Sequence, residues 1–148
     1  MTVPVPLFST GGKDTYRQSQ NAALKATTTL SKDGKVIGSS TYPGWGSFTA
    51  PDAGVYEIRS QATRELPWTA LGTSAEAVWT VPDKLVDGPL PLLVVRTSAD
   101  QEARAGRLHC LKVDVQKPAG SRIMKLGVEV SFDDGKTWRR CRSSRATR

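Results

Sequence analysis

The 148-residue chain has few of the residues on which metal sites and nucleotide cofactor sites are built. It contains one histidine, His109, and two cysteines, Cys110 and Cys141. A structural zinc site needs four such ligands, so we expect no metal. No phosphate-binding loop or dinucleotide fingerprint occurs, and we expect no cofactor. A disulfide between the two cysteines stays open, since it would need an oxidising compartment.

Long apolar runs are also missing. No stretch approaches the roughly 20 apolar residues of a membrane span. Residues 1–6 lack the charged start and apolar run of a signal peptide. We therefore expect a chain that is soluble, has no membrane partner and is cytoplasmic as it stands.

The net positive charge is small outside the C-terminus. The net charge is +7, but the last ten residues hold five arginines and no acid, so subtracting these five leaves +2 for the rest. The rest shows no basic stripe interleaved with aromatic residues, so nucleic acid is not an expected partner. We expect residues 142–148 to be a basic disordered tail.

The residues that are plentiful favour short strands joined by turns. Thirteen glycines and nine prolines are spread along a chain rich in Thr, Ser and Val. Alternation is clearest at 56–63, where Tyr56, Ile58, Ser60 and Ala62 face one way and the polar residues Glu57, Arg59, Gln61 and Thr63 the other. The sequence therefore predicts an all-β protein of antiparallel sheets, with Trp45 and Phe48 as core candidates. Further strands are expected at 24–32, 35–38, 45–48, 77–81, 90–96, 106–116 and 126–132.

A hairpin over 126–138 is the most informative segment. Leu126, Val128, Val130 and Phe132 alternate with small or polar residues and predict a half-buried strand that turns at 133–135. The turn resembles the Asp-box, S-x-D-x-G-x-T-W. Its matching positions are Ser131, Asp133, Gly135, Thr137 and Trp138. The resemblance implies that the Asp holds the turn and the Trp packs beneath it, a structural role.

A second motif begins at Asp52. Asp52, Gly54 and Tyr56, followed by Ile58, resemble the tyrosine corner of immunoglobulin-like sandwiches. In that motif the Tyr hydroxyl bonds to upstream backbone while the ring is buried. Ile58 stands where many such domains have Cys, so the inter-sheet disulfide would be absent. The fold expected is an immunoglobulin- or fibronectin-like β-sandwich.

Domain boundaries follow from composition. Residues 1–21 show no sustained period and are expected to be irregular, with an edge strand at 3–8 at best because Pro4 and Pro6 cannot donate hydrogen bonds. A sandwich unit is expected over 22–83 and a second over 88–141, separated by a proline-bounded linker. The second has about four expected strands where a sandwich needs about seven, so it looks truncated.

Catalysis is not expected. Gly72-Thr73-Ser74 matches the way some serine peptidases present a nucleophile, but Ser74 would need a histidine base oriented by a carboxylate. His109, the one candidate base, shares the inward parity of Leu111. The adjacent Asp133 and Asp134 are needed by their turn, so a glycosidase pair is unsupported. No catalytic residue is assigned.

Taken in order, residues 30–139 resemble the non-catalytic C-terminal region of secreted subtilisin-like (S8 family) serine peptidases of actinobacteria. The shared phrases are the Asp33-Gly34 hairpin, G-x-G-x-F at 44–48, the corner at 54–58, Ala-Thr-Arg at 62–64, the Trp79 strand, L-P-L-L-x-V-R at 90–96, A-G-R at 105–107 and V-E-V-S-F-D-D-G-K-T-W-R at 128–139.

The resemblance implies a non-catalytic accessory module, extracellular if it belongs to such a peptidase, whose partner is a peptidase domain, an extracellular protein or a glycan. The arginine-rich end departs from the family, and we expect a terminal fragment made by a reading-frame shift. The alternative is a carbohydrate-binding or sialidase-related module that uses the Asp-box and exposed tryptophans among Trp45, Trp68, Trp79 and Trp138. The oligomeric state is left open.

Overall fold

A computed structural model describes residues 1–5, 7, 24–65, 67, 73–81, 90–99, 111–133 and 135–142. Several predictions therefore fall outside the described residues: those on Trp68, His109, Cys110, Asp134, the linker at 82–89 and the tail beyond Arg142. The chain divides into two compact units, Met1–Pro118 (unit 1) and Ala119–Arg148 (unit 2).

All regular structure in the described residues is β-strand, and every strand pair is antiparallel, which confirms the predicted all-β class. The stacking of these sheets into a sandwich stays a prediction. The strands are β1 (Thr2–Pro4), β2 (Leu24–Lys32), β3 (Lys35–Ser40), β4 (Trp45–Ser47), β5 (Tyr56–Arg64), β6 (Ser74–Val81), β7 (Val94–Ala99), β8 (Leu111–Gln116), β9 (Glu129–Val130) and β10 (Arg139–Arg140).

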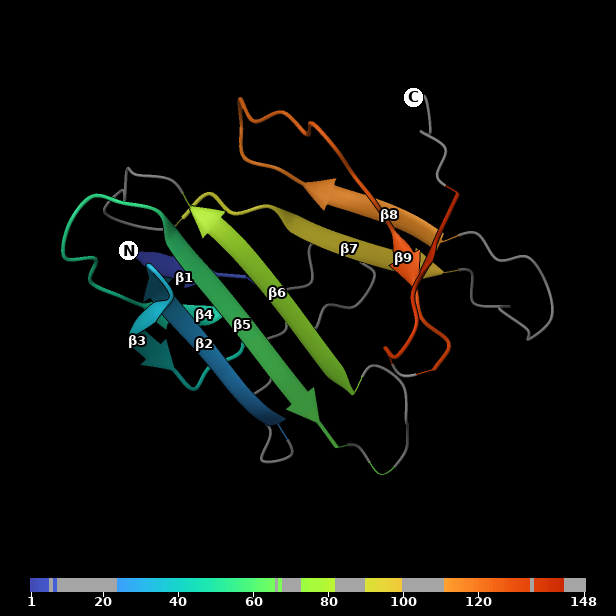
Figure 1. Cartoon of the computed structure of the whole chain (residues 1–148), viewed down its shortest axis with the longest axis horizontal. Coiled ribbons are helices and arrows are strands. Elements are labelled where there is room, and N and C mark those ends of the chain that lie inside the picture. Colours follow the sequence, from blue (N-terminus) through green and yellow to red (C-terminus); the bar gives the residue numbers. More distant parts are fainter. Residues whose placement is uncertain are drawn as a thin grey trace. The chain divides into compact units, whose positions relative to one another are not determined.

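Unit 1 is built on a four-stranded sheet in the order β3-β2-β5-β6, with β2, β5 and β6 as its long strands (Figure 1). The period-2 pattern of β5 holds without exception from Tyr56 to Thr63: alternate side chains are buried and exposed. The inward residues of β5 meet Leu30 of β2 in the core, while the outward ones face solvent. One face of the sheet is therefore dry and the other wet, as the alternation predicts.

The turn between β2 and β3 follows directly from its two residues. Asp33 and Gly34 have φ values of +50° and +76°. A two-residue hairpin of this kind requires positive φ at both central positions, and Asp-Gly is a preferred pair for it. Lys32 and Lys35 consequently pair across the turn, which confirms the predicted hairpin.

The N-terminus is more ordered than the sequence predicts. The first strand, β1, pairs with β4, and Val3 and Val5 are buried in the main core with Leu30, Phe48 and Ile58. Alternation of valine with proline places both valines on one side, and a short two-stranded sheet tolerates the missing donor of Pro4. Val3 and Val5 therefore belong to the core, although the sequence predicts at most an edge strand in this segment.

A second hairpin, β7–β8, belongs to unit 1. Leu90 is buried in the core of unit 1, and Leu92 and Val94 pack against it. The indole N–H of Trp79 in β6 also donates to the carbonyl of Leu93 at 2.9 Å. These contacts explain why the division falls at Pro118, which differs from the sandwich units predicted at 22–83 and 88–141.

Unit 2 contains the hairpin of β9 and β10, which confirms that the chain reverses at 133–135. Its strand is shorter than predicted, however, with only Glu129 and Val130 in regular pairing. The predicted apolar face is covered only in part: Val128 and Val130 are half-buried, whereas Phe132 is 85% exposed and Leu126 is also exposed. An alternating pattern buries its apolar side only where another layer packs on it, and no described residue buries these two.

Candidate functional site

The turn from Ser131 to Trp138 is held by a dense set of short polar contacts. The Ser131 hydroxyl donates to Asp133 Oδ1 at 2.8 Å and accepts from the Gly135 N–H at 2.8 Å. Asp133 also accepts from the N–H of Thr137 at 2.8 Å and from its hydroxyl at 2.6 Å. Gly135 has a φ of +84°, which a side chain would strain. The turn is thus fixed by local hydrogen bonds.

These hydrogen-bond donors lower the pKa of Asp133. Hydrogen bonds from the Thr137 hydroxyl and N–H, followed by that from Ser131, lower the pKa of Asp133 from 3.8 to about 2. Donors that favour the charged form of a carboxyl group lower its pKa in this way. The Asp133 carboxylate is therefore occupied as the structural centre of the turn.

Trp138 lies against the turn and is largely exposed. Its indole N–H donates to the carbonyl of Gly135 at 3.1 Å, and its ring lies 3.7 Å from the position a Gly135 Cβ would take. The side chain nevertheless remains 60% exposed. The packing of Trp138 beneath the turn therefore stays a prediction: the indole bonds to the turn at Gly135, and no described layer covers the rest of the ring. The turn fixes the orientation of the ring but leaves much of it in solvent.

An open groove of about 600 Å³ lies beside this tryptophan. It lies within unit 2 and is lined by Lys125, Gly127, Val128, Glu129, Trp138 and Arg140. Glu129 and Arg140 are direct cross-strand partners, so their side chains lie on the same face of the hairpin. One aromatic ring, two cations and one carboxylate therefore border the same hollow.

Comparisons with known proteins give no relative. No family model, curated protein or solved structure matches the chain significantly. The relation to S8 peptidases and to Asp-box proteins therefore stays a prediction.

The sequence identifies Trp138 as a candidate site residue, but it does not identify the residues that line the groove with it. Lys125, Glu129 and Arg140 carry no motif, and they reach one groove only through the register of β9 and β10. The signal that could have found them is the alternation itself: extending the strand back from Glu129 places Gly127 and Lys125 on the same side. That face was predicted to be the polar one, without a binding role.

The second predicted motif surrounds Tyr56 in unit 1. Its ring is fully buried, and its hydroxyl donates to the carbonyl oxygen of Asp52 and lies 3.1 Å from the Asp52 carboxylate. Lys32 donates to that carboxylate at 2.6 Å, which with Tyr56 holds the pKa of Asp52 below its usual value. Gly54 leaves room for this lysine, since a Cβ there would lie 2.7 Å from Lys32 Cε. These contacts fix the entry of β5.

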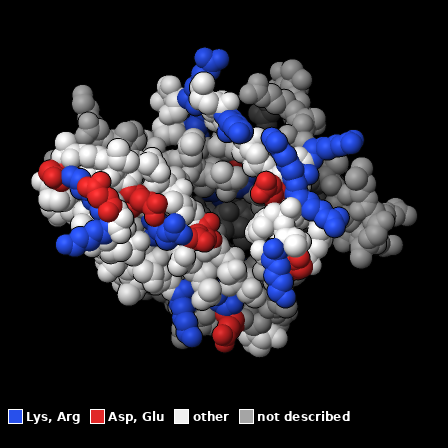
Figure 2. Space-filling view, viewed as in Figure 1, with Lys and Arg blue, Asp and Glu red and all other residues white. Residues whose placement is uncertain are grey.

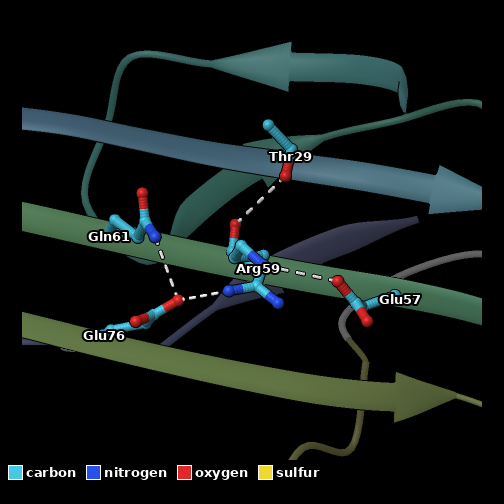
Figure 3. A network of polar contacts seen from close by, with 5 residues as sticks. All are labelled: Thr29, Glu57, Arg59, Gln61 and Glu76. Carbon is cyan, nitrogen blue, oxygen red and sulfur yellow. Dashed lines mark hydrogen bonds and ion pairs between the residues drawn. The ribbon is translucent and has the colours of Figure 1, made fainter. Parts of the chain in front are cut away.

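The wet face of the sheet carries a polar network that joins three strands (Figure 3). Arg59 pairs with Glu57 and Glu76, and Gln61 donates to Glu76 at 2.9 Å. Hydrogen bonds from Gln61 and then Arg59 lower the pKa of Glu76. Both signs of charge are interspersed on this side (Figure 2), and Arg59 and Glu76 neutralise each other. The network leaves little charge for a ligand.

A smaller hollow of about 290 Å³ lies at the Asp33-Gly34 end of the sheet. Its lining includes Asp33 and Glu57, and its one aromatic residue, Tyr56, is fully buried. It therefore offers no exposed ring to a ligand. The unit 2 groove is the better candidate site.

The other candidate residues form no catalytic site and no metal site among the described residues. Ser74 begins β6, where it is exposed and pairs with Thr63, and His109 lies outside the described residues. Cys141 is half-buried and free, and Cys110 also lies outside them. The described part of the chain holds no cluster of three or more potential metal ligands. It also has no helix able to cross a membrane.

Proposed function

We propose that the chain is a non-catalytic accessory module that binds carbohydrate through the groove of unit 2. The observation that carries the proposal is the state of Trp138: an exposed indole, oriented by its bond to Gly135 and forming part of a groove wall. Aromatic rings give ligands a large apolar contact surface, and a ring already held in place loses little conformational entropy on binding.

The lining is suited to a polar, hydroxyl-rich ligand. Apart from the indole and Val128, the side chains around the groove are the charged ones of Lys125, Glu129 and Arg140. The lysine and arginine donate hydrogen bonds to hydroxyl oxygens and the glutamate accepts from hydroxyl hydrogens. A sugar ring presents an apolar face to the indole and hydroxyls at its rim, so one ligand can use all of these contacts.

The accessory role is supported by the resemblance to the C-terminal region of secreted S8 peptidases. A carbohydrate-binding module would hold such an enzyme at a polysaccharide surface, which is one of the roles the resemblance implies. The structural role predicted for the turn and the binding role of its tryptophan are compatible, because different atoms serve them. The coding sequence next to the gene tests the parentage: an adjacent S8 peptidase domain is expected.

A glycan array probed with the full chain tests the binding proposal. Trp138→Ala should abolish the array signal because it removes the stacking surface. Phe132→Ala is the matched control, since Phe132 is an exposed aromatic of the same hairpin that does not line the groove. Equal binding by wild type and Trp138→Ala, or no binding by the wild type, would overturn the proposal.

A protein ligand is the second candidate, and exposed apolar side chains outside the groove favour it. Met124 and Phe132 are 84% and 85% exposed. Such side chains are commonly covered by a partner. No array binding by the wild type would overturn the carbohydrate proposal and leave this candidate.

A further inference from the structure

We infer that the carbohydrate taken by the groove of unit 2 is acidic, with sugars that carry carboxylate groups, as in a polyuronate. This inference rests on the proposed function and adds the class of ligand. It stands on three features of the described residues: the sorting of side chains between the two faces of the hairpin, the unpaired cations, and the open floor at Gly127.

The hairpin register sorts its side chains between two faces. Arg140 lies opposite Glu129, and Arg139 lies opposite Val130. Because side chains alternate along a strand, Trp138 shares the face of Arg140, and Arg139 points the other way. Consistent with this, Trp138 and Arg140 line the groove and Arg139 does not. The indole ring of Trp138 and the guanidinium group of Arg140 therefore lie on the same face of the hairpin.

Positive charge dominates unit 2. Its described residues include six basic side chains, at Arg122, Lys125, Lys136, Arg139, Arg140 and Arg142, and two acidic ones, at Glu129 and Asp133. Asp133 is engaged by its own turn. Within the described part of the chain, none of the six forms an ion pair. On the sheet of unit 1, by contrast, Arg59 is neutralised by Glu57 and Glu76.

Lys125 and Arg140 therefore present donors to the groove that have no acceptor among the described residues. Charge-assisted bonds from such donors to a carboxylate are stronger than bonds to a neutral hydroxyl. The carboxylate of Glu129 bonds to sugar hydroxyls, but it repels closely spaced phosphates. A carboxylated sugar satisfies both signs of charge, so it fits this lining better than a nucleic acid strand.

Gly127 keeps the floor of the groove open. A Cβ built at this position meets no atom within 4 Å, and Gly127 has no positive φ. A larger side chain is therefore sterically allowed there and would project into the space that the ligand needs. Gly127→Leu is consequently expected to block the groove while the hairpin keeps its fold.

The test compares two forms of one ligand, with free carboxylate groups and with the same groups neutralised as methyl esters. Isothermal titration calorimetry on the full chain would use a galacturonate hexamer and the same hexamer with methyl-esterified carboxyls. We expect about tenfold tighter binding of the acid form, a preference that weakens as salt is raised. Arg140→Gln should remove most of that preference, a loss of about fivefold for an exposed charge. Its matched control, Arg139→Gln, should retain it.

The outcomes separate the inference from the function on which it rests. Equal affinity for the two hexamers, with binding lost in Trp138→Ala and Gly127→Leu, would overturn the acidic preference and leave the carbohydrate proposal standing. No binding to either hexamer would overturn the acidic ligand, and the glycan array would decide the function. Tighter binding of an oligothymidylate than of the acid hexamer, lost in the same variants, would overturn both.

Discussion

A chain of hydrogen bonds joins Ser60, Thr28 and the turn before β4. It leads to a quantitative prediction of stability. Ser60 and Thr28 are fully buried, and their hydroxyl oxygens lie 2.7 Å apart. The Thr28 hydroxyl donates to the carbonyl of Tyr42 at 2.8 Å. Because Thr28 has a single hydroxyl proton, Ser60 is the donor between them. The Ser60 oxygen in turn accepts from the N–H of Gly44 at 2.8 Å.

Ser60→Ala therefore removes two hydrogen bonds. It leaves the buried N–H of Gly44 without its acceptor, which costs about 1–3 kcal/mol, and it removes a buried hydroxyl pair worth about 1 kcal/mol. The expected loss in the free energy of unfolding is about 3 kcal/mol. For a unit of this size that loss lowers Tm by roughly 10 °C.

Thr28→Val keeps the shape of the side chain and removes the middle hydroxyl. The carbonyl of Tyr42 belongs to an exposed residue and can bond to water, but the buried Ser60 hydroxyl loses its acceptor, so the expected cost is about 2 kcal/mol. The double variant should cost about 1 kcal/mol less than the sum, because the shared bond is lost once. Thr27→Val, on the exposed face of the same strand, is the matched control and should change stability by less than about 0.5 kcal/mol.

Urea unfolding followed by far-ultraviolet circular dichroism measures these free energies. The reasoning is refuted if Ser60→Ala costs less than about 0.5 kcal/mol, the level of an ordinary surface change. It is also refuted if Thr27→Val is as costly as Thr28→Val. Strict additivity in the double variant would show that the two hydroxyls do not share a bond.

Four further predictions concern the turns and the exposed surfaces. The folded pKa of Asp133, about 2, lies below the ordinary 3.8, so its turn is stabilised above about pH 4 and loses that stabilisation as the pH falls toward 2. A carboxyl NMR titration with a midpoint near 4 would contradict this. Gly44→Ala should cost at least about 3 kcal/mol in urea unfolding, because Gly44 has a φ of +64° and a Cβ would lie 1.7 Å from the Val5 carbonyl oxygen. A cost under about 1 kcal/mol would refute the packing argument. The wild-type chain should self-associate through Met124 and Phe132, and replacing both by Ser should reduce its sedimentation coefficient; a monomeric wild type would count against this. A fluorophosphonate probe should leave Ser74 unlabelled, and labelling would show an activated nucleophile.

The sheet of unit 1 could be predicted because the sequence patterns that indicate its strands and turns are local. Period-2 alternation identifies the dry face of β5, and Asp33-Gly34 identifies its neighbouring hairpin, whatever packs on them. The N-terminal strand was predicted as an edge strand at best, because Pro4 and Pro6 argue against a strand. Val3 is nevertheless buried, through pairing with a partner more than 40 residues away. Long-range pairing of that kind leaves no mark in a short window of sequence.

The tryptophans show that residue type alone does not predict which side chains are buried. Trp45 was expected in the core, yet it is 37% exposed, while Phe48 of the same segment is buried as predicted. Trp79 is partly buried against the core, and Trp138 is largely exposed. Residue type predicts burial only on average. Whether a given ring is covered depends on the neighbouring layer, and the groove beside Trp138 depends on strand register as well.

The turn in unit 2 suggests how a small hairpin can present a binding surface. An exposed hairpin with little apolar burial is ordinarily marginal. Here Asp133 and Ser131 supply five hydrogen bonds inside the turn, and Trp138 adds a sixth through its indole N–H. Because these bonds do not require the ring to be buried, the face of Trp138 is available to a ligand. Local polar contacts that order the turn thereby make an exposed aromatic groove possible, and for this reason the structural role of the turn is compatible with the proposed binding role of Trp138.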